Sequence, residues 1–246
     1  MNINELRAQA DALAQNDVGT DMSQAKKTES FLLPEGTAVA RLVEYIEFGS
    51  QPQEYQGKAK PAKMEFRLGF ALYGDKYVKE DGTPRVISTF DIPLDNASKS
   101  KAFLIFQRMN HKKVYKNFAQ MLGETFVVSI KHKVDSKGVV RANLDLSAVG
   151  PAIDAMTGRP YQVPEAPGDL YKVFLWNSPT KEQWDSLYIE GTRDDGRSKN
   201  FLQEKCLRAL NYNGSKLQAL LEGDVPQDMV ASPWADTMPN DDDIPM

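Results

Sequence analysis

Two segments with a period-two pattern of side chains place the strongest constraint on the fold. The first begins at Thr37 and continues through Ile46, and the second spans Met64 to Tyr73. The second segment places Met64, Phe66, Leu68, Phe70 and Leu72 on one side and Glu65, Arg67, Gly69, Ala71 and Tyr73 on the other. Because successive side chains of a strand point to opposite faces, this pattern predicts two strands of a sheet. One face of the second strand belongs to a core, and we expect the other face to be available.

Further strands and a helical insert follow in the chain. A third strand is predicted over 85–92, after the turn residues 81–84, and two more over 125–134 and 139–149. Between them, 99–122 has mostly helical spacing of apolar residues. Three strands, a helical insert and two strands predict a mainly β chain with α, in the order of a five-stranded OB-fold barrel. A different small β-barrel or a sandwich is the alternative.

The segments on either side of this core have a different composition. We expect a flexible or helical arm over 1–30, the OB-fold core over 31–150, a helical extension packed on the core over 151–222 and a disordered acidic tail over 223–246. In the extension, Thr180 and Gln183 form a capping-box pattern at a helix start. A longer helix is predicted from Ser198, with Leu210 among its buried residues and its end near Gly214.

Composition excludes several classes of protein. No apolar stretch is long enough for a transmembrane helix, and no secretory leader is evident. The single Cys206 excludes an intramolecular disulfide, and His111 and His132 have no metal-ligand spacing, so no metal or cofactor is expected. These features favour the cytoplasm. The adjacent pair Asp194 and Asp195 is expected in an exposed turn rather than in a metal-dependent nuclease, and no catalytic motif is present, so an enzyme is not expected.

Charge is separated along the chain. Residues 38–149 carry 18 Lys and Arg against 12 Asp and Glu, although the whole chain has a formal charge of −4. Residues 222–246 contain seven acidic residues and no Lys or Arg. A basic body with an acidic tail is typical of a protein that binds a phosphate backbone and exposes a polyanion, although an ordinary mixed surface could also carry this charge.

Basic and aromatic residues gather in the predicted core. The segment 49–63 is expected to form a basic loop with an aromatic tip, and small residues on the outer face of the second strand leave room for a flat ring. The candidate nucleic-acid-binding residues are Arg41, Tyr55, Lys58, Lys60, Lys63, Arg67, Tyr73, Lys76, Tyr77, Lys131, Lys133 and Arg141. The alternatives are a solvated loop and tyrosines that only cover one end of the core.

The last six residues read Asp241, Asp242, Asp243, Ile244, Pro245 and Met246. This ending resembles the acidic tip of bacterial single-stranded-DNA-binding proteins, which finish in Asp-Asp-Asp-Ile-Pro-Phe, with Met246 in the place of Phe. Together with the basic body, the chain resembles a bacteriophage single-stranded-DNA-binding protein of the OB-fold type. An acidic tail that only aids solubility is the alternative for these residues.

The resemblance implies a function. Such proteins coat single-stranded DNA without sequence preference during phage replication, recombination and repair in the host cytoplasm. Their tips recruit a polymerase, helicase or primase. The sequence does not decide between a monomer and a homodimer. The alternative is a replisome adaptor or scaffold that uses residues 241–246 for partner binding and does not bind DNA.

Overall fold

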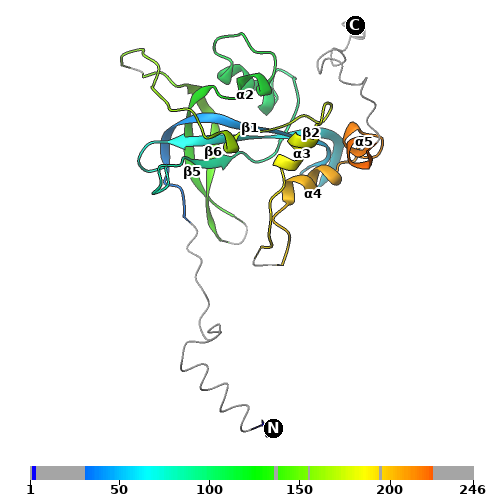
Figure 1. The fold of residues 1–246 in the computed structure, drawn as a ribbon. Helices are drawn as coiled ribbons and strands as arrows, with labels where there is room; N and C mark the ends of the chain where they lie inside the picture. Colours follow the sequence, from blue (N-terminus) through cyan, green and yellow to red (C-terminus); the bar gives the residue numbers. More distant parts are fainter. Residues whose placement is uncertain (1, 4–30, 136–137, 155, 194–195, 224–246) are drawn as a thin grey trace, which may run out of the picture. The chain divides into compact units, whose positions relative to one another are not determined.

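The computed structural model describes residues 2–3, 31–135, 138–154, 156–193 and 196–223 (Figure 1). The predicted arm over 1–30, apart from residues 2–3, lies outside the described residues, as do the tip at 241–246 and the pair Asp194 and Asp195. The body begins at Leu33.

A long β-hairpin forms the centre of the sheet. Strand β1 (Gly36–Tyr55) pairs antiparallel with β2 (Lys58–Tyr73) through a turn at Gln56 and Gly57, which both have positive φ. Two successive residues with positive φ form the turn that suits the right-handed twist of a two-residue hairpin. The predicted loop over 49–63 is therefore wrong. Both strands continue through this segment as a two-stranded arm, because the Gln-Gly turn requires only two residues.

The remaining strands extend the sheet on both sides of this hairpin. Strands β3 (Arg85–Ser88) and β4 (Ile92–Pro93) both pair with β2, while β5 (Thr125–Val134) pairs with β1 and with β6 (Val140–Pro151). The resulting order is β3-β2-β1-β5-β6, and all of these pairs are antiparallel. In the described residues no strand pairing joins β3 to β6, so the sheet is open and the predicted closed barrel is not confirmed.

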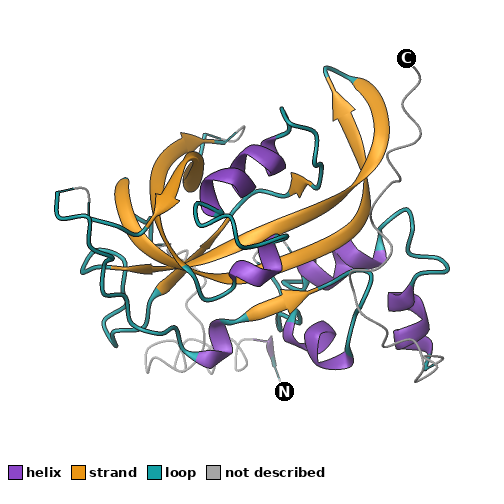
Figure 2. Ribbon diagram, turned by 90° about the horizontal axis from the view of Figure 1, so that it is seen from above, coloured by secondary structure: helices purple, strands orange, loops and turns teal. Residues whose placement is uncertain are grey.

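The predicted helical insert lies between β4 and β5. It comprises α2 (Lys101–Met109), which begins at the N-cap Ser100, and the short 3-10 helix η1 (Phe118–Met121). The hydroxyl of Ser100 accepts a hydrogen bond from the amide of Phe103, which satisfies a donor that the first helical turn leaves free. Figure 2 shows helices on both sides of the crossing strands.

The first core confirms the period-two prediction for β2 from Phe66 onward, whereas Met64, predicted on the same face, packs against a separate cluster around Phe48 and Trp176. Phe66, Leu68, Phe70 and Leu72 are buried with apolar residues of β1, β5, α2 and η1. Phe66 stacks on Phe118 at a centroid distance of 4.8 Å, which joins the sheet to the insert. Burial of large apolar side chains is the main stabilising contribution in such a core.

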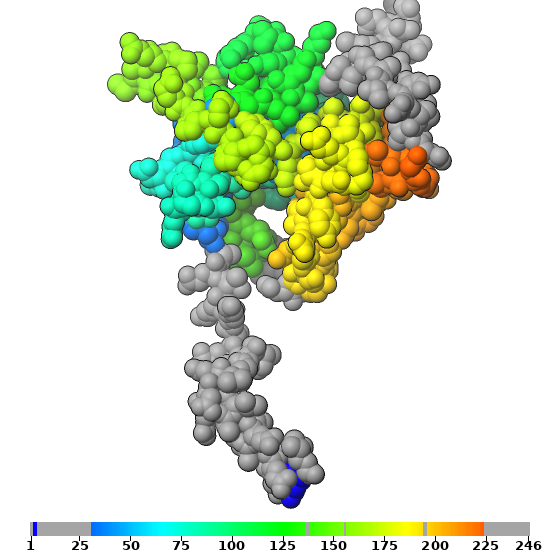
Figure 3. Space-filling view, viewed as in Figure 1, coloured from blue at the N-terminus to red at the C-terminus, as the bar shows by residue number. Residues whose placement is uncertain are grey.

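The segment after β6 packs on the opposite side of the hairpin. It contains η2 (Gly168–Leu170), β7 (Lys172–Phe174), α3 (Lys181–Ser186), α4 (Phe201–Leu207) and α5 (Lys216–Glu222). Strand β7 pairs in parallel with β1, and Phe174, Trp176 and Trp184 form a second core with Ile46 and Phe48. In Figure 3 these segments, yellow to orange, lie together on one side of the body.

Close packing explains a glycine in β1. Gly49 has a φ of +72°, and a Cβ at this position would lie 2.6 Å from Trp176 and 2.7 Å from Ala209. The extension therefore approaches the β1 backbone more closely than any side chain at residue 49 would permit.

The helix boundaries in the extension differ in part from the prediction. Thr180 caps α3 and accepts a hydrogen bond from the amide of Gln183, as its sequence pattern predicts. The helix predicted from Ser198 is shorter, and Leu210 lies outside α4 with 65% of its surface exposed. Within the described residues, no helix is long and apolar enough to cross a membrane.

Candidate nucleic-acid interface

Arg41 is buried and occupied inside the protein. Its guanidinium donates hydrogen bonds to the carbonyls of Gly123, Val163 and Pro164, and only 7% of the residue is exposed. It also forms an ion pair with Glu165. Arg41 thus holds the segment after β6 against the sheet, and it does not lie with the exposed candidates.

Arg67 is also held within the structure. Its guanidinium pairs with Asp91 at 2.7 Å and lies over the rings of Phe48 and Phe201. Lys205 of α4 bonds to the same Asp91, so this network joins β2 to the C-terminal extension. The face of β2 that we expected to be available is therefore covered.

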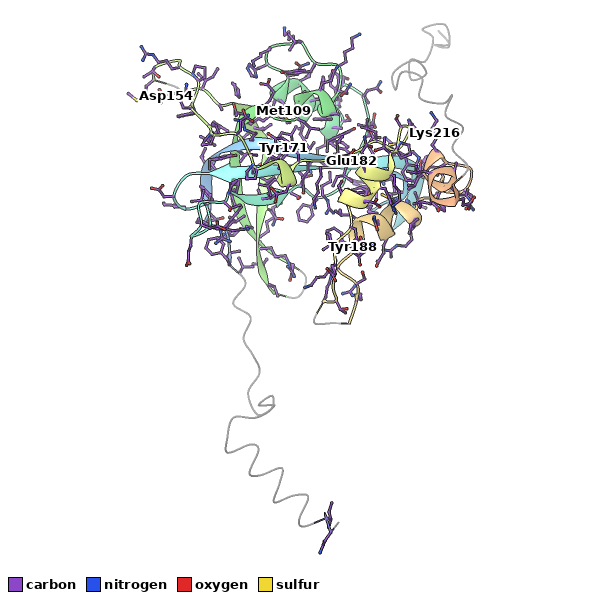
Figure 4. The ribbon with its side chains drawn as sticks, viewed as in Figure 1. Met109, Asp154, Tyr171, Glu182, Tyr188 and Lys216 are labelled. Atoms are coloured by element: carbon purple, nitrogen blue, oxygen red, sulfur yellow. The ribbon has the colours of Figure 1, made fainter. Side chains whose placement is uncertain are left out.

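The small residues on this face have a different role from the predicted one. A Cβ at Gly69 would lie 2.1 Å from Oε2 of Glu44, so the side chain of Glu44 fills the space predicted for a ring. Ala71 packs with Ala166, and partly buried Tyr73 and Tyr171 complete this cluster. Figure 4 shows Tyr171 beside the strands. Tyr77 is buried in the first core, which agrees with the alternative that it covers the core end.

Four exposed candidates, Lys60, Lys63, Lys131 and Lys133, line two hollows on another part of the surface. The larger hollow, of about 520 Å³, lies between α2, the β5–β6 pair and Phe90. Its lining includes Lys99, Lys101, Leu104, Arg108, Lys131, Lys133, Asn143 and Asp145. Two predicted residues, Lys131 and Lys133, therefore meet three further cations from the helical insert.

Phe90 reaches this surface because of an irregularity in the strand pairing. Ser88 of β3 pairs with Gly69 and Ile92 of β4 pairs with Phe66, so the three residues between β3 and β4 lie opposite only two residues of β2. The extra residue makes a bulge, which redirects side chains at that point. Phe90 is 63% exposed, and it supplies a ring on which a base could stack.

A second hollow, of about 510 Å³, adjoins the first. It is lined by Gln53, Lys60, Pro61, Lys63, Pro93, Asp95, Ser100 and Lys101. Lys101 lines both hollows, so together they form one surface from the β1–β2 arm to the β5–β6 pair, which we call the basic track. Tyr55 lies beside it, because Nζ of Lys60 is 4.5 Å from the centre of its ring.

The basic track carries a strongly positive net charge. Seven cations line it, Lys60, Lys63, Lys99, Lys101, Arg108, Lys131 and Lys133, against the two carboxylates of Asp95 and Asp145. Lys63 pairs with Asp95 and Lys131 with Asp145, and these contacts hold the pKa of both carboxyls below their usual range. Both acids are consequently ionised at neutral pH, and the surface keeps a net charge of +5.

The other predicted residues are exposed but do not line the track. Lys58 lies at the turn of the arm, and Lys76 lies in the loop after β2. Arg141 forms an ion pair with Asp135 on the β5–β6 hairpin.

Sequence reasoning missed four basic or aromatic residues of the track: Phe90, Lys99, Lys101 and Arg108. Lys99 and Lys101 flank Ser100 at the start of the predicted helix, and Arg108 lies two turns after Lys101 on the same face. Their spacing marks them as a basic helix face, but nothing in it shows that this face meets β5 and β6. No group of three or more potential metal ligands occurs in the described residues.

Comparisons with models of protein families, with curated proteins and with solved structures give no match for this chain.

Proposed function

We propose that this chain binds single-stranded DNA without sequence preference along the basic track. The observation that carries the proposal is the net charge of +5 on two adjoining hollows, with the exposed ring of Phe90 at one of them. Lysine and arginine contact phosphates whatever the sequence, and bases of every kind stack on an aromatic ring. No catalytic activity is proposed.

The strand order supports a finer proposal for the fold. An OB-fold is a partly open five-stranded barrel that binds oligonucleotides with one face and with its first and last hairpins. Taking β3 and β4 as one interrupted strand and leaving aside β7, which joins β1 from the C-terminal extension, the sheet has five strands with α2 between the third and the fourth. We infer an OB-type barrel that is open between β3 and β6, with the β1–β2 and β5–β6 hairpins at the two ends of the track.

A titration with a fluorescently labelled oligonucleotide tests DNA binding. We expect a single strand to bind more tightly than a duplex of the same sequence, and the logarithm of affinity to fall linearly with that of salt concentration, with a slope of about −0.7 per phosphate contacted. Absent binding at low salt, or affinity that salt does not change, would contradict the proposal.

For the acidic tip we propose recruitment of replication proteins. Three carboxylates favour a partner pocket with Lys or Arg, and Ile244 and Met246 supply an apolar contact. Deletion of residues 241–246 should abolish capture of a polymerase, helicase or primase and strengthen DNA binding, with the melting temperature unchanged. Retained capture would exclude this role. Capture by the tip without any DNA binding would instead support the adaptor function.

A further inference from the structure

Strand β6 ends the sheet. In the described part of the chain its only strand partner is β5, so one edge of β6 is unpaired. An unpaired edge presents a row of backbone donors and acceptors that can bind another strand.

The hydrogen bonds of β5 show which groups of β6 face outward. The amide of His132 donates to Oε1 of Glu35, which directly precedes β1, so it points away from β6. His132 is paired with Ala142. Because bonded and non-bonded pairs alternate in an antiparallel ladder, the backbone groups of Ala142 and Leu144 face the free edge, while those of Asn143 face β5.

The sequence along this edge is complementary to itself. In an antiparallel pair of two identical strands centred on Asn143, Ala142 faces Leu144 of the other copy and Arg141 faces Asp145. The outward groups of Ala142 and Leu144 then meet in hydrogen-bonded pairs, and Arg141 meets Asp145 in the closer, non-bonded pair. From the unpaired edge and this complementarity, we propose that two copies of the chain associate through β6, in antiparallel register about Asn143.

The register follows from charge. A centre on Ala142 would place Asp145 opposite Val139, and a centre on Leu144 would place Arg141 opposite Ser147. Of these three centres, only Asn143 brings opposite charges together, and it does so twice because the pair is two-fold symmetric.

Existing contacts present a small obstacle. Arg141 now pairs with Asp135, while Asp145 pairs with Lys131 and accepts hydrogen bonds from the amide and the hydroxyl of Ser147. The cations of the two ion pairs are 62% and 59% exposed and the carboxylates 25% and 23%, and ion pairs with an exposed partner contribute little to stability, so Arg141 and Lys131 can exchange partners at low cost.

The dimer edge and the larger hollow overlap. Asn143, Leu144 and Asp145 line that hollow, so a second copy on β6 occupies space next to the proposed DNA strand. The proposal itself does not need DNA binding, because association is measured without nucleic acid. If both proposals hold, an added oligonucleotide shifts the chain toward the monomer.

Sedimentation velocity of the full chain over a concentration series tests the association. Arg141→Asp and Asp145→Arg should each raise the dimer dissociation constant by about tenfold or more, because each places like charges opposite one another. The double variant with both changes should restore association. The double variant loses the ion pairs that residue 141 makes with Asp135 and residue 145 makes with Lys131 within one copy. Restored association would therefore come from the contact between residues 141 and 145 of the two copies. The matched control is Arg208→Asp, a charge reversal of an exposed arginine on the C-terminal side of α4.

A crosslink tests the register. In the proposed pair Asn143 faces its own copy at a Cα separation of about 4.5 Å, which a disulfide can span. Asn143→Cys should therefore give a disulfide-linked dimer on oxidation, whereas Ser147→Cys, which faces residue 139, should not. The native Cys206 is buried and does not compete. A monomer at every concentration, or a dimer that the charge variants leave unchanged, would overturn the proposal.

Discussion

The chain has two groups of basic residues near the central hairpin, and they are used differently. Arg41 is buried and Arg67 is partly buried, and carbonyls, a carboxylate and aromatic rings surround their guanidinium groups. The lysines of the basic track, by contrast, extend from the arm, from α2 and from β5 over two hollows. Arginine retains its charge and has five donors in a fixed plane, which suits it to buried contacts. The difference shows that a basic side chain on a strand is available to a ligand only where the chain itself leaves that strand uncovered.

The largest expected effect comes from reversing charge on the track alone. The triple variant Lys99→Glu, Lys101→Glu and Arg108→Glu should weaken binding of a single-stranded oligonucleotide by about 100-fold or more at low salt, and it should flatten the salt dependence. Fluorescence anisotropy measures both.

The control for this triple variant reverses the charge of three exposed cations outside the basic track, Lys79, Lys181 and Arg208. Equal losses in the two triple variants would mean that total charge, and not the track, determines binding.

Removal of a buried arginine should affect stability instead. Arg41→Met leaves the carbonyls of Gly123, Val163 and Pro164 without their donor, so the free energy of unfolding should fall by about 2 to 4 kcal/mol. Urea denaturation measures this change. If Arg41→Met keeps full stability and loses DNA affinity, the distinction between covered arginines and the exposed basic track is wrong, because Arg41 would then belong to the binding surface.

A smaller effect is expected at the exposed ring. Phe90→Ala should reduce the binding free energy by about 1 to 3 kcal/mol, the contribution of one stacked base, and leave the melting temperature unchanged. Val114 is similarly exposed but does not line the hollows, so Val114→Ala is the control. If the two variants bind equally well, Phe90 does not stack on a base.

The smallest effect concerns a partly buried carboxyl next to the covered face. Glu47 accepts hydrogen bonds from the Tyr45 hydroxyl at 2.7 Å and from the Trp176 amide at 2.8 Å, and burial raises its pKa despite both bonds. The folded protein therefore retains a proton that the unfolded chain has released, so this group's contribution to stability falls as pH rises above about 4.5.

Glu47→Gln removes that dependence. The difference in unfolding free energy, variant minus wild type, should increase between about pH 4 and pH 7. Urea denaturation across this range measures it, with Glu54→Gln on the exposed arm as the control. A difference that is constant with pH would show that Glu47 titrates alike in the folded and unfolded states.

Much of the secondary structure follows from local pattern. The alternation in β2 predicts its buried face, because only a strand places Phe66, Leu68, Phe70 and Leu72 on one side. The helical spacing after Lys99 predicts the insert, and Thr180 predicts the start of α3. The arm over 49–63 was missed because Gly49 and two prolines are typical of a loop, whereas the pairing of β1 with β2 continues through them.

The candidate site could be predicted only in part. Lys60, Lys63, Lys131 and Lys133 line the hollows, while the roles of Arg67 and Tyr73 depend on a segment some 100 residues later in the chain. Phe90 could not be found from composition, because its exposure results from a bulge in the pairing of two strands.

The sequence by itself determined the main strand segments outside 49–63, the insert, the basic core segment and the acidic ending, since these depend on the chemistry and spacing of neighbouring residues. Only the tertiary structure decided which face of the hairpin is covered and which cations come together. The reason is physical: coverage depends on contacts between distant segments, such as Trp176 against Gly49, and the period of a strand shows that it has two faces without showing what packs on each.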